Sequence, residues 1–129
     1  MKLIIDTHIA IWTLSDDKRL SELARSYIEN PNNIIYVSAV SVWKVAIKHQ
    51  AKPETIHFDA EMFLNYCIKS GFLILPIKET HAMETEHLPW VHKDPFDRML
   101  ISQAKIEGMI LLTSDEKIAS YGTNYILKV

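Results

Sequence analysis

The sequence predicts a single α/β domain over residues 1–129, with a mainly parallel sheet of about five strands and helices on both of its faces. Three observations lead to this prediction. Five short aliphatic runs are spread along the chain, and segments of helical period lie between them. No repeat or Gly/Ser-rich linker interrupts this alternation. The 129 residues are 48% apolar, which is enough to bury one core.

The expected strands are aliphatic runs without polar alternation, which is typical of strands that are buried on both faces of a sheet. They cover residues 3–5, 34–37, 73–75, 110–112 and 125–127. In a doubly wound sheet, ligands bind outside the carboxyl ends of the strands, where loops turn into helices. Functional residues are therefore expected directly after the strands.

The expected helices have apolar residues at helical spacing. Such spacing occurs over residues 20–28, 42–46 and 63–67, and a further helix is expected after Thr7. The segment from Asp94 to Gly108 carries the strongest boundary signals, because Asp94 can act as an N-cap, Pro95 suits the first turn and Gly108 suits the end of a helix.

Composition and charge exclude several classes of protein. There are 14 Lys and Arg against 16 Asp and Glu, a formal charge of -2, so any contact with nucleic acid is expected to be local. No apolar run is long enough to span a membrane, and the first residues reach Asp6 too early for a signal peptide, so we expect a cytoplasmic protein. The lone Cys67 excludes an intramolecular disulfide and is expected to lie in the core.

Three carboxylates follow strands or begin helices, namely Asp6, Asp97 and Asp115. We expect them to converge at one point above the sheet. Carboxylates held together repel one another, and a hard cation such as Mg²⁺ or Mn²⁺ removes this repulsion. Such an ion can lower the pKa of a bound water and hold a phosphodiester for attack, which is the chemistry of nucleic-acid hydrolysis.

Each acid also has a purely structural interpretation. Asp after a strand or at a helix start is a common N-cap, and this is the interpretation that we favour for Asp94. Asp97 could be the reciprocal partner in that cap or an acid favoured by the helix dipole. Asp6 is less easily explained as a cap alone, because it follows three aliphatic residues directly and precedes Thr7 at a turn into a helix.

Four blocks of sequence, in order along the chain, together resemble the PIN domain and most closely its VapC-type toxin branch. They are Ile4–Trp12, Val37–Lys48, His92–Ala104 and Leu112–Asp115. The resemblance implies a three-layer α/β/α sandwich and an endoribonuclease that depends on Mg²⁺ or Mn²⁺. It also implies a homodimer that cuts RNA and is inhibited by a small cognate antitoxin protein.

The resemblance further implies roles for particular residues. Asp6, Asp97 and Asp115 match the acidic metal-site residues of the family, and plausible hydroxyl neighbours of that site are Thr7, Ser38 and Thr113. The sequence departs from the family at Lys44, which stands where the family has Glu. Three Asp and one Lys give the site a formal charge of about -2, roughly what one divalent ion neutralises, so we expect one ion at most.

Lys44 has three interpretations. It could point to solvent, although Lys48 one turn later makes this unfavourable by roughly 0.2–0.5 kcal/mol. It could place its ammonium among the Asp residues as a substitute cation, which holds them together without metal and removes activity, and this is the interpretation that we rank first. It could also be an inactivating Glu→Lys change of the kind that expression of a toxic nuclease selects.

The remaining candidates are weaker. Arg98 and Lys48 could face a substrate phosphate or could be solvated charges. The three Trp residues could stack on unpaired bases, but core or dimer-interface positions are favoured for them. The spacing of the His residues does not suit zinc.

Two functions follow as the main candidates. The first is a metal-dependent ribonuclease whose activity Lys44 puts in doubt, and the second is a silent PIN domain that binds RNA or an antitoxin. A phospho-acceptor domain needs paired acids after the first strand, and a haloacid-type phosphatase needs an Asp-x-Asp there. Asp6-Thr7-His8 meets neither requirement.

Overall fold

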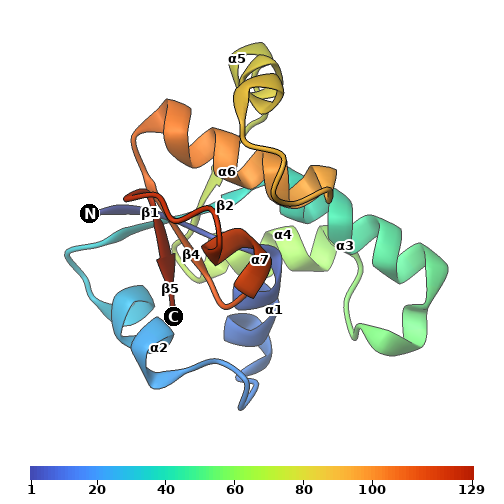
Figure 1. Cartoon of the computed structure of the whole chain (residues 1–129). Helices are drawn as coiled ribbons and strands as arrows, with labels where there is room; N and C mark the ends of the chain where they lie inside the picture. Colours follow the sequence, from blue (N-terminus) through green and yellow to red (C-terminus); the bar gives the residue numbers. More distant parts are fainter.

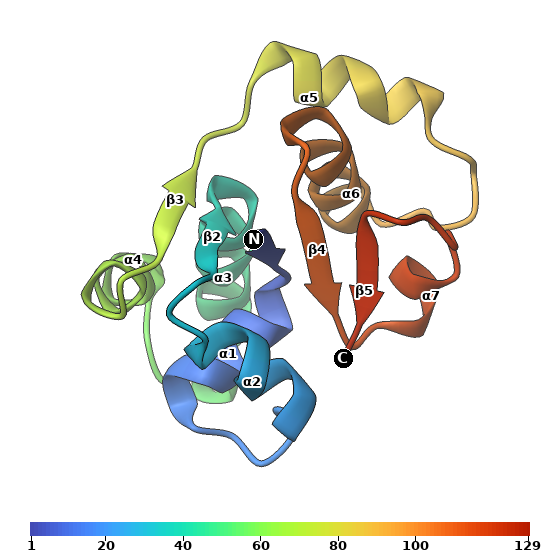
Figure 2. The same ribbon diagram turned by 90° about the vertical axis from the view of Figure 1, so that its left-hand side faces the viewer.

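The computed structural model describes residues 1–129 and contains one five-stranded sheet in the order β3-β2-β1-β4-β5 (Figures 1 and 2). The strands are β1 (Lys2–Ile5), β2 (Ile34–Ser38), β3 (Leu73–Leu75), β4 (Ile110–Thr113) and β5 (Ile126–Lys128). Every neighbouring pair is parallel. The five predicted strands are thus confirmed, and the sheet is wholly rather than mainly parallel.

Seven α-helices connect and cover the strands. They are α1 (Thr7–Ser15), α2 (Glu22–Glu29), α3 (Ala39–Ala51), α4 (Ala60–Lys69), α5 (Glu79–Glu84), α6 (Pro95–Glu107) and α7 (Glu116–Ala119), with 3-10 turns η1 (Pro53–Thr55) and η2 (Thr85–His87). As predicted, α6 starts after the N-cap Asp94 and ends at Gly108, whose φ of 65° suits glycine. None of the helices has the length and apolar character that crossing a membrane requires.

Helices cover both faces of the sheet. The side chains of β1 point alternately into the two cores that result. Leu3 and Ile5 pack in one core with residues of α1, α2 and α4, and Cys67 of α4 is buried there as predicted. Ile4 packs in the other core with residues of α6 and α7. In Figure 2, α1, α2 and α4 lie apart from α6 and α7. The predicted α/β/α sandwich is therefore confirmed.

The strand order places the reversal of the fold between β1 and β4. From β1 the chain adds β2 and then β3 on one side, and it then crosses back to add β4 and β5 on the other. The backbone N–H of Asp6, just beyond β1, donates to the carbonyl oxygen of Leu112 in β4 at 3.1 Å. In open α/β sheets this switch point is where ligands bind.

Candidate active site

A polar cavity of about 390 Å³ opens at this switch point. Its walls come from the loops that follow β1 and β4 and from the first turns of α1, α6 and α7, together with α3. All but one of its lining residues are polar, and they include Asp6, Asp94, Asp97 and Asp115. The three acids predicted from the sequence therefore share one cavity, and Asp94 joins them. We call this cavity the acidic pocket.

Three of the four aspartates are N-caps as well as pocket residues. Asp6 Oδ1 accepts from the N–H of Ile9 at 2.8 Å and caps α1, and Asp115 Oδ1 accepts from the N–H of Lys117 at 2.7 Å and caps α7. Asp94 Oδ1 caps α6 in the same way. A carboxylate has two oxygens, so a cap made by one leaves the other available for a second contact. The structural and functional interpretations of these acids are therefore compatible.

Asp6 is the most deeply buried of the four acids, with 3% of its surface exposed. The hydroxyl of Thr113 donates to its Oδ2, and the oxygen of that hydroxyl accepts from the N–H of Asp115 at 3.0 Å. Burial raises the pKa of Asp6 to about 6, with the charges of Asp97 and Asp115 adding to the rise and the hydrogen bonds opposing it. Ionised Asp6 therefore lacks a compensating positive charge.

Lys44 extends from α3 into the acidic pocket. Its Nζ lies 3.9 Å from Asp97 Oδ1 and 4.0 Å from Asp94 Oδ2, and only 17% of the side chain is exposed. The ammonium also lies 5.8 Å from the centre of the Phe96 ring. The interpretation in which Lys44 points to solvent is therefore wrong. Its geometry is that of a cation held among the acids.

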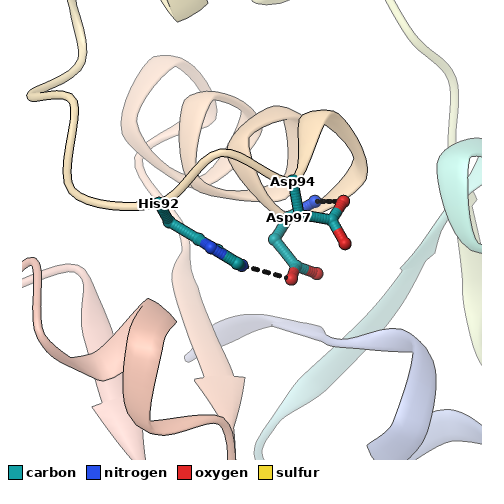
Figure 3. Close-up of side chains that lie close together, drawn as sticks. All are labelled: His92, Asp94 and Asp97. Atoms are coloured by element: carbon teal, nitrogen blue, oxygen red, sulfur yellow. Dashed lines mark hydrogen bonds and ion pairs between the residues drawn. The ribbon is translucent and has the colours of Figure 1, made fainter.

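His92 also belongs to the acidic pocket, and sequence reasoning missed it. Its Nε2 lies 2.8 Å from Asp97 Oδ2 (Figure 3). The ligand atoms of His92, Asp94 and Asp97 all lie within 4.8 Å of one another, and no other acid or histidine joins this group. The position of His92 two residues before the N-cap Asp94 could have indicated a place in the pocket. From the sequence alone, the histidines were considered only as zinc ligands.

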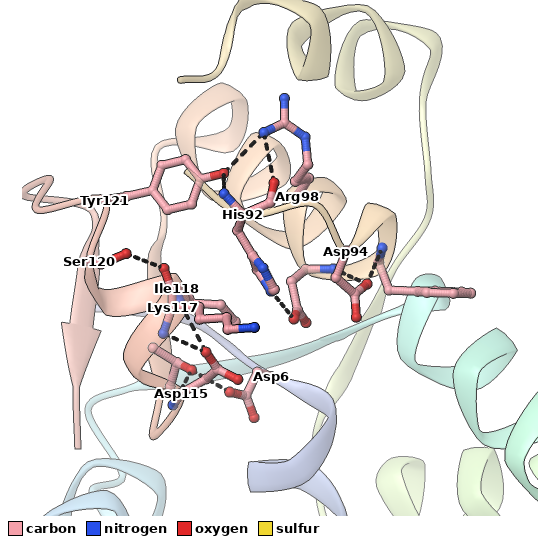
Figure 4. A network of polar contacts seen from close by, with 12 residues as sticks. Asp6, His92, Asp94, Arg98, Asp115, Lys117, Ile118, Ser120 and Tyr121 are labelled. Carbon is pink, nitrogen blue, oxygen red and sulfur yellow. Dashed lines mark hydrogen bonds and ion pairs between the residues drawn. The ribbon is translucent and has the colours of Figure 1, made fainter. Parts of the chain in front are cut away.

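The pocket has two sides, and the three predicted acids divide between them, with Asp97 on the side of α6. Asp6 and Asp115 lie on one side, at the ends of β1 and β4, whereas Asp94 and His92 lie across from them at the start of α6 (Figure 4). The carboxylate oxygens fit the hard-oxygen preference of Mg²⁺ or Mn²⁺. The ammonium of Lys44 contacts the α6 side only, so its charge competes there with any ion for Asp97.

The hydroxyl residues predicted near the site hold the elements that surround it. Thr7 is buried and its Oγ1 lies 2.8 Å from Oγ of Ser41, which joins α1 to α3. Ser38 is buried and caps α3 by accepting from the N–H of Val40 at 3.0 Å. Of the three, only Thr7 lines the pocket, and only Thr113 bonds directly to a pocket acid.

Arg98 fits neither of its two interpretations from the sequence, because it is buried rather than solvated and does not line the acidic pocket. It is 6% exposed, and its guanidinium donates to three carbonyl oxygens within residues 85–92 at 2.7–3.2 Å and to the hydroxyl of Tyr121 at 3.0 Å (Figure 4). The ring of Trp90 lies against it at 4.5 Å. Arg98 is thus a structural anchor of the loop that carries His92.

Lys48 lies one turn beyond Lys44 on α3, and its Nζ is 3.4 Å from His8 Nε2 beside the acidic pocket. Burial and the charge of Lys44 lower the pKa of Lys48. Two of the three Trp residues are not in the core, because Trp43 is 58% exposed and Trp90 is 70% exposed. Trp12 packs against the core and is partly buried.

Comparison with known proteins identifies the fold independently. The family model described as the PIN domain matches residues 3–124. None of the curated protein sequences matches this chain. Among solved structures, VapBC2 from Rickettsia felis bound to a promoter DNA fragment is similar, with a TM-score of 0.72 and 14% identity over 99% of this chain and 98% of that one.

Two further solved structures are similar over nearly their whole length. DNA-bound VapBC from Salmonella typhimurium has a TM-score of 0.70 and 14% identity, covering 99% of this chain and 98% of that one. A toxin–antitoxin complex from Klebsiella pneumoniae has a TM-score of 0.66 and 18% identity, covering 97% and 95%. At these identities the likeness concerns the fold.

Proposed function

This chain belongs to the PIN domain family, and from this premise we propose that it is a divalent-metal-dependent endoribonuclease, the VapC-type toxin of a toxin–antitoxin pair, whose own Lys44 suppresses cleavage. The observation that supports the proposal is the acidic pocket at the switch point of the sheet, which four aspartates line and in which the ammonium of Lys44 lies beside two of them. We propose that residues 1–129 act as one domain in the cytoplasm.

In this proposal Asp6, Asp97 and Asp115 hold at most one ion, Mg²⁺ or Mn²⁺. When bound, such an ion supplies a water of lowered pKa and a clamp on the phosphodiester. His92 orients the carboxylate of Asp97 through the 2.8 Å contact. Asp94 and Thr113 support the site, Asp94 as the cap of α6 and Thr113 as the donor to Asp6.

A second candidate function is a catalytically silent PIN domain that binds RNA or an antitoxin. The position of Lys44 favours it, because an ammonium 3.9 Å from Asp97 and 4.0 Å from Asp94 relieves the repulsion of these acids without a metal ion. In that case binding survives and hydrolysis does not. The role of Lys44 is thus the feature that distinguishes the two candidate functions.

For partners we propose RNA, a cognate antitoxin protein and a second copy of the chain. The antitoxin proposal is supported by the similar solved structures, which are toxin–antitoxin complexes. The homodimer proposal is supported by an apolar hollow between α3 and α6, where the ring of exposed Trp43 packs edge-on against Phe96 at 4.9 Å and exposed Ile77 joins the lining. Light scattering on Trp43→Ser against the parent chain tests the homodimer.

The experiment that tests the function is cleavage of a mixed RNA pool in about 5–10 mM Mg²⁺ or Mn²⁺, a range that saturates weak carboxylate sites. The parent chain is compared with Lys44→Glu and with Lys44→Glu combined with Asp6→Asn. Lys69→Glu, on an exposed lysine of α4, is the matched control for charge. We expect Lys44→Glu alone to cut, and EDTA to abolish the cutting.

The other outcomes are equally informative. Cleavage by the parent chain would mean that the aspartates suffice and that Lys44 does not suppress activity. Absence of cleavage in every variant would contradict the ribonuclease proposal and leave the silent binding domain. Cleavage that persists in the Asp6→Asn variant would mean that the acidic pocket is not the active site.

A further inference from the structure

A second cavity, of about 380 Å³, lies beside the acidic pocket between α1, the second half of α3 and η1. The two cavities share His8. The walls of the second cavity are apolar or basic except at Thr55, and no carboxylate lines it. Its volume lies within the range of about 300–1,000 Å³ that is typical of small-ligand sites. We call it the basic cavity.

The lysines of this cavity lie on the second half of α3 and just beyond its end. Lys44 and Lys48 lie one turn apart on α3, which places their side chains about 6 Å apart, and Lys52 follows the last residue of the helix as its C-cap. Lys44 enters the acidic pocket, whereas Lys48 and Lys52 line the basic cavity. The spacing is close to that of successive phosphates along a single nucleic-acid strand.

Neither Lys48 nor Lys52 has an acidic partner, although the other charged group of the cavity does. Arg19 is paired with Asp17 at 2.8 Å, but no carboxylate lies within ion-pair distance of the two lysines. The neighbours of Lys48 are cationic or neutral, since its Nζ lies 3.4 Å from His8. Lys48 is partly buried without a counter-charge, and the exposed Lys52 adds a second unpaired cation, which together favour the binding of an anion.

Flat groups form one wall of the same cavity. The guanidinium of Arg19 lies over the Trp12 ring at 5.2 Å, and the His8 ring lies 5.8 Å from the ring of Trp12. Ile11 and Ile47 complete this wall. A nucleobase packs well against such a surface, because every base has a π-face and stacking tolerates any sequence. An acidic peptide would use the lysines but not the stacked wall.

We propose that the basic cavity is a nucleotide subsite for single-stranded RNA, next to the position of the scissile phosphate. Phosphates of the strand pair with Lys48 and Lys52, and one base packs against the wall formed by Trp12 and Arg19. This inference rests on the proposed function for the identity of the substrate. It adds a place where the strand is held outside the acidic pocket.

The phosphate contacts are tested by fluorescence anisotropy with a labelled ten-nucleotide oligouridylate, in EDTA so that no cleavage occurs. We expect Lys48→Ala and Lys52→Ala each to weaken binding about fivefold near 0.1 M salt and to lower the salt slope by about 0.7. Lys69→Ala, on the exposed face of α4, should change neither quantity. Equal effects of the three substitutions would overturn the inference.

The base contact is tested by changing the probe, because Trp12 also packs against the core and its removal could unfold the protein. An oligomer with the same number of phosphates but with abasic sites should bind at least about fivefold more weakly to the parent chain. Equal binding of both oligomers would overturn the nucleotide subsite. Displacement of the RNA by a polyglutamate peptide at equal charge would overturn it in favour of an acidic peptide.

The inference and the proposed function can fail separately. If Lys44→Glu cuts RNA but Lys48→Ala binds RNA as tightly as the parent chain, the subsite is wrong and the ribonuclease stands. If no variant cuts while binding still depends on Lys48 and on the base, the ribonuclease is wrong and the subsite stands as part of a binding domain.

Discussion

Two polar clusters lie at opposite ends of α6, and they differ in whether their acids have basic partners. At the far end from the acidic pocket, side chains connect residues 78–84 to the last turns of α6, and we call these contacts the α5–α6 seam. Glu107 is 3.2 Å from Lys78 and 3.0 Å from His81, and Glu84 pairs with Lys105. Each acid of the seam thus has a basic partner.

The acidic pocket has no such balance. Four aspartates and Glu116 line it. Asp97 contacts His92 at 2.8 Å and Lys44 at 3.9 Å, and Asp94 lies 4.0 Å from Lys44, but no basic group lies within ion-pair distance of Asp6 or Asp115. The consequence appears in the pKa values, because burial raises the pKa of Asp6 to about 6, whereas hydrogen bonds from His81 and Lys78 lower the pKa of Glu107. Matched charges stabilise the fold, and unmatched charges are characteristic of functional sites.

The largest expected effect on stability comes from Arg98, in the first turn of α6, which anchors the loop of residues 85–92. We expect Arg98→Leu to lower the free energy of unfolding by about 2–4 kcal/mol, because three carbonyl oxygens and the hydroxyl of Tyr121 lose their buried donor. Urea denaturation measures the change. Arg25→Leu is the matched control, since Arg25 forms ion pairs with the exposed acids Asp16 and Glu29 and its loss should destabilise the fold far less. Equal losses of stability in the two variants would show that the hydrogen bonds of Arg98 contribute nothing beyond surface ion pairing.

In the acidic pocket, a substitution that removes a charge should instead stabilise the protein. We expect Asp6→Asn to raise the free energy of unfolding by about 1–3 kcal/mol at pH 8 in EDTA, because it removes a buried charge that lacks a partner. The folded pKa of Asp6 is raised from 3.8 to about 6, so its favourable contribution is complete below pH 3.8 and is lost as the pH rises through 6. The gain should therefore vanish at pH 3.5.

Thermal unfolding of both proteins between pH 3.5 and pH 8 checks this prediction. A variant that is less stable than the parent chain at pH 8 would show that the contact with Thr113 outweighs the burial of the charge. The comparison between the two clusters would then fail, because both would be stabilised by their acids.

The same contrast explains how much the sequence could predict. The strands were found because aliphatic runs such as Leu3–Ile5 are buried whatever their neighbours are, and α6 was found because Asp94 and Gly108 are local signals. Helix α5 was missed, because its six residues carry no apolar period and its place depends on the contact of His81 with Glu107.

The site was predicted to a similar extent and for similar reasons. Asp6 and Asp115 were found because they directly follow strands, which fixes their place at the carboxyl edge of the sheet. His92 and Arg98 depend on the path of the loop between η2 and α6, which no local signal determines. Their roles required the three-dimensional structure.

The contrast can be sharpened by removing the charge of Lys44. We expect Lys44→Gln to tighten Mn²⁺ binding roughly tenfold, or about 1.4 kcal/mol, because the ammonium no longer repels an ion beside Asp97. Isothermal titration calorimetry measures this affinity. Lys93→Gln, on an exposed lysine that does not line the pocket, is the control and should bind Mn²⁺ as the parent does. Unchanged affinity in Lys44→Gln would mean that the ammonium does not compete with metal.

The smallest expected effect comes from the seam, at Glu107. We expect Glu107→Gln to lower the free energy of unfolding by roughly 1 kcal/mol at pH 7, because a carboxylate that accepts from Lys78 and His81 is replaced by a neutral amide. The folded pKa of Glu107 lies below its usual 4.5, so its contribution is present above pH 4.5 and is lost as the pH falls through the folded pKa. Urea denaturation at pH 7 and pH 3, with the exposed Glu86→Gln as control, should therefore show a loss that shrinks in acid. Asp6→Asn should change stability with the opposite sign, because its effect near neutral pH is a gain that also disappears in acid. Two substitutions that change stability in the same direction would contradict the division of α6 into a balanced and an unbalanced end.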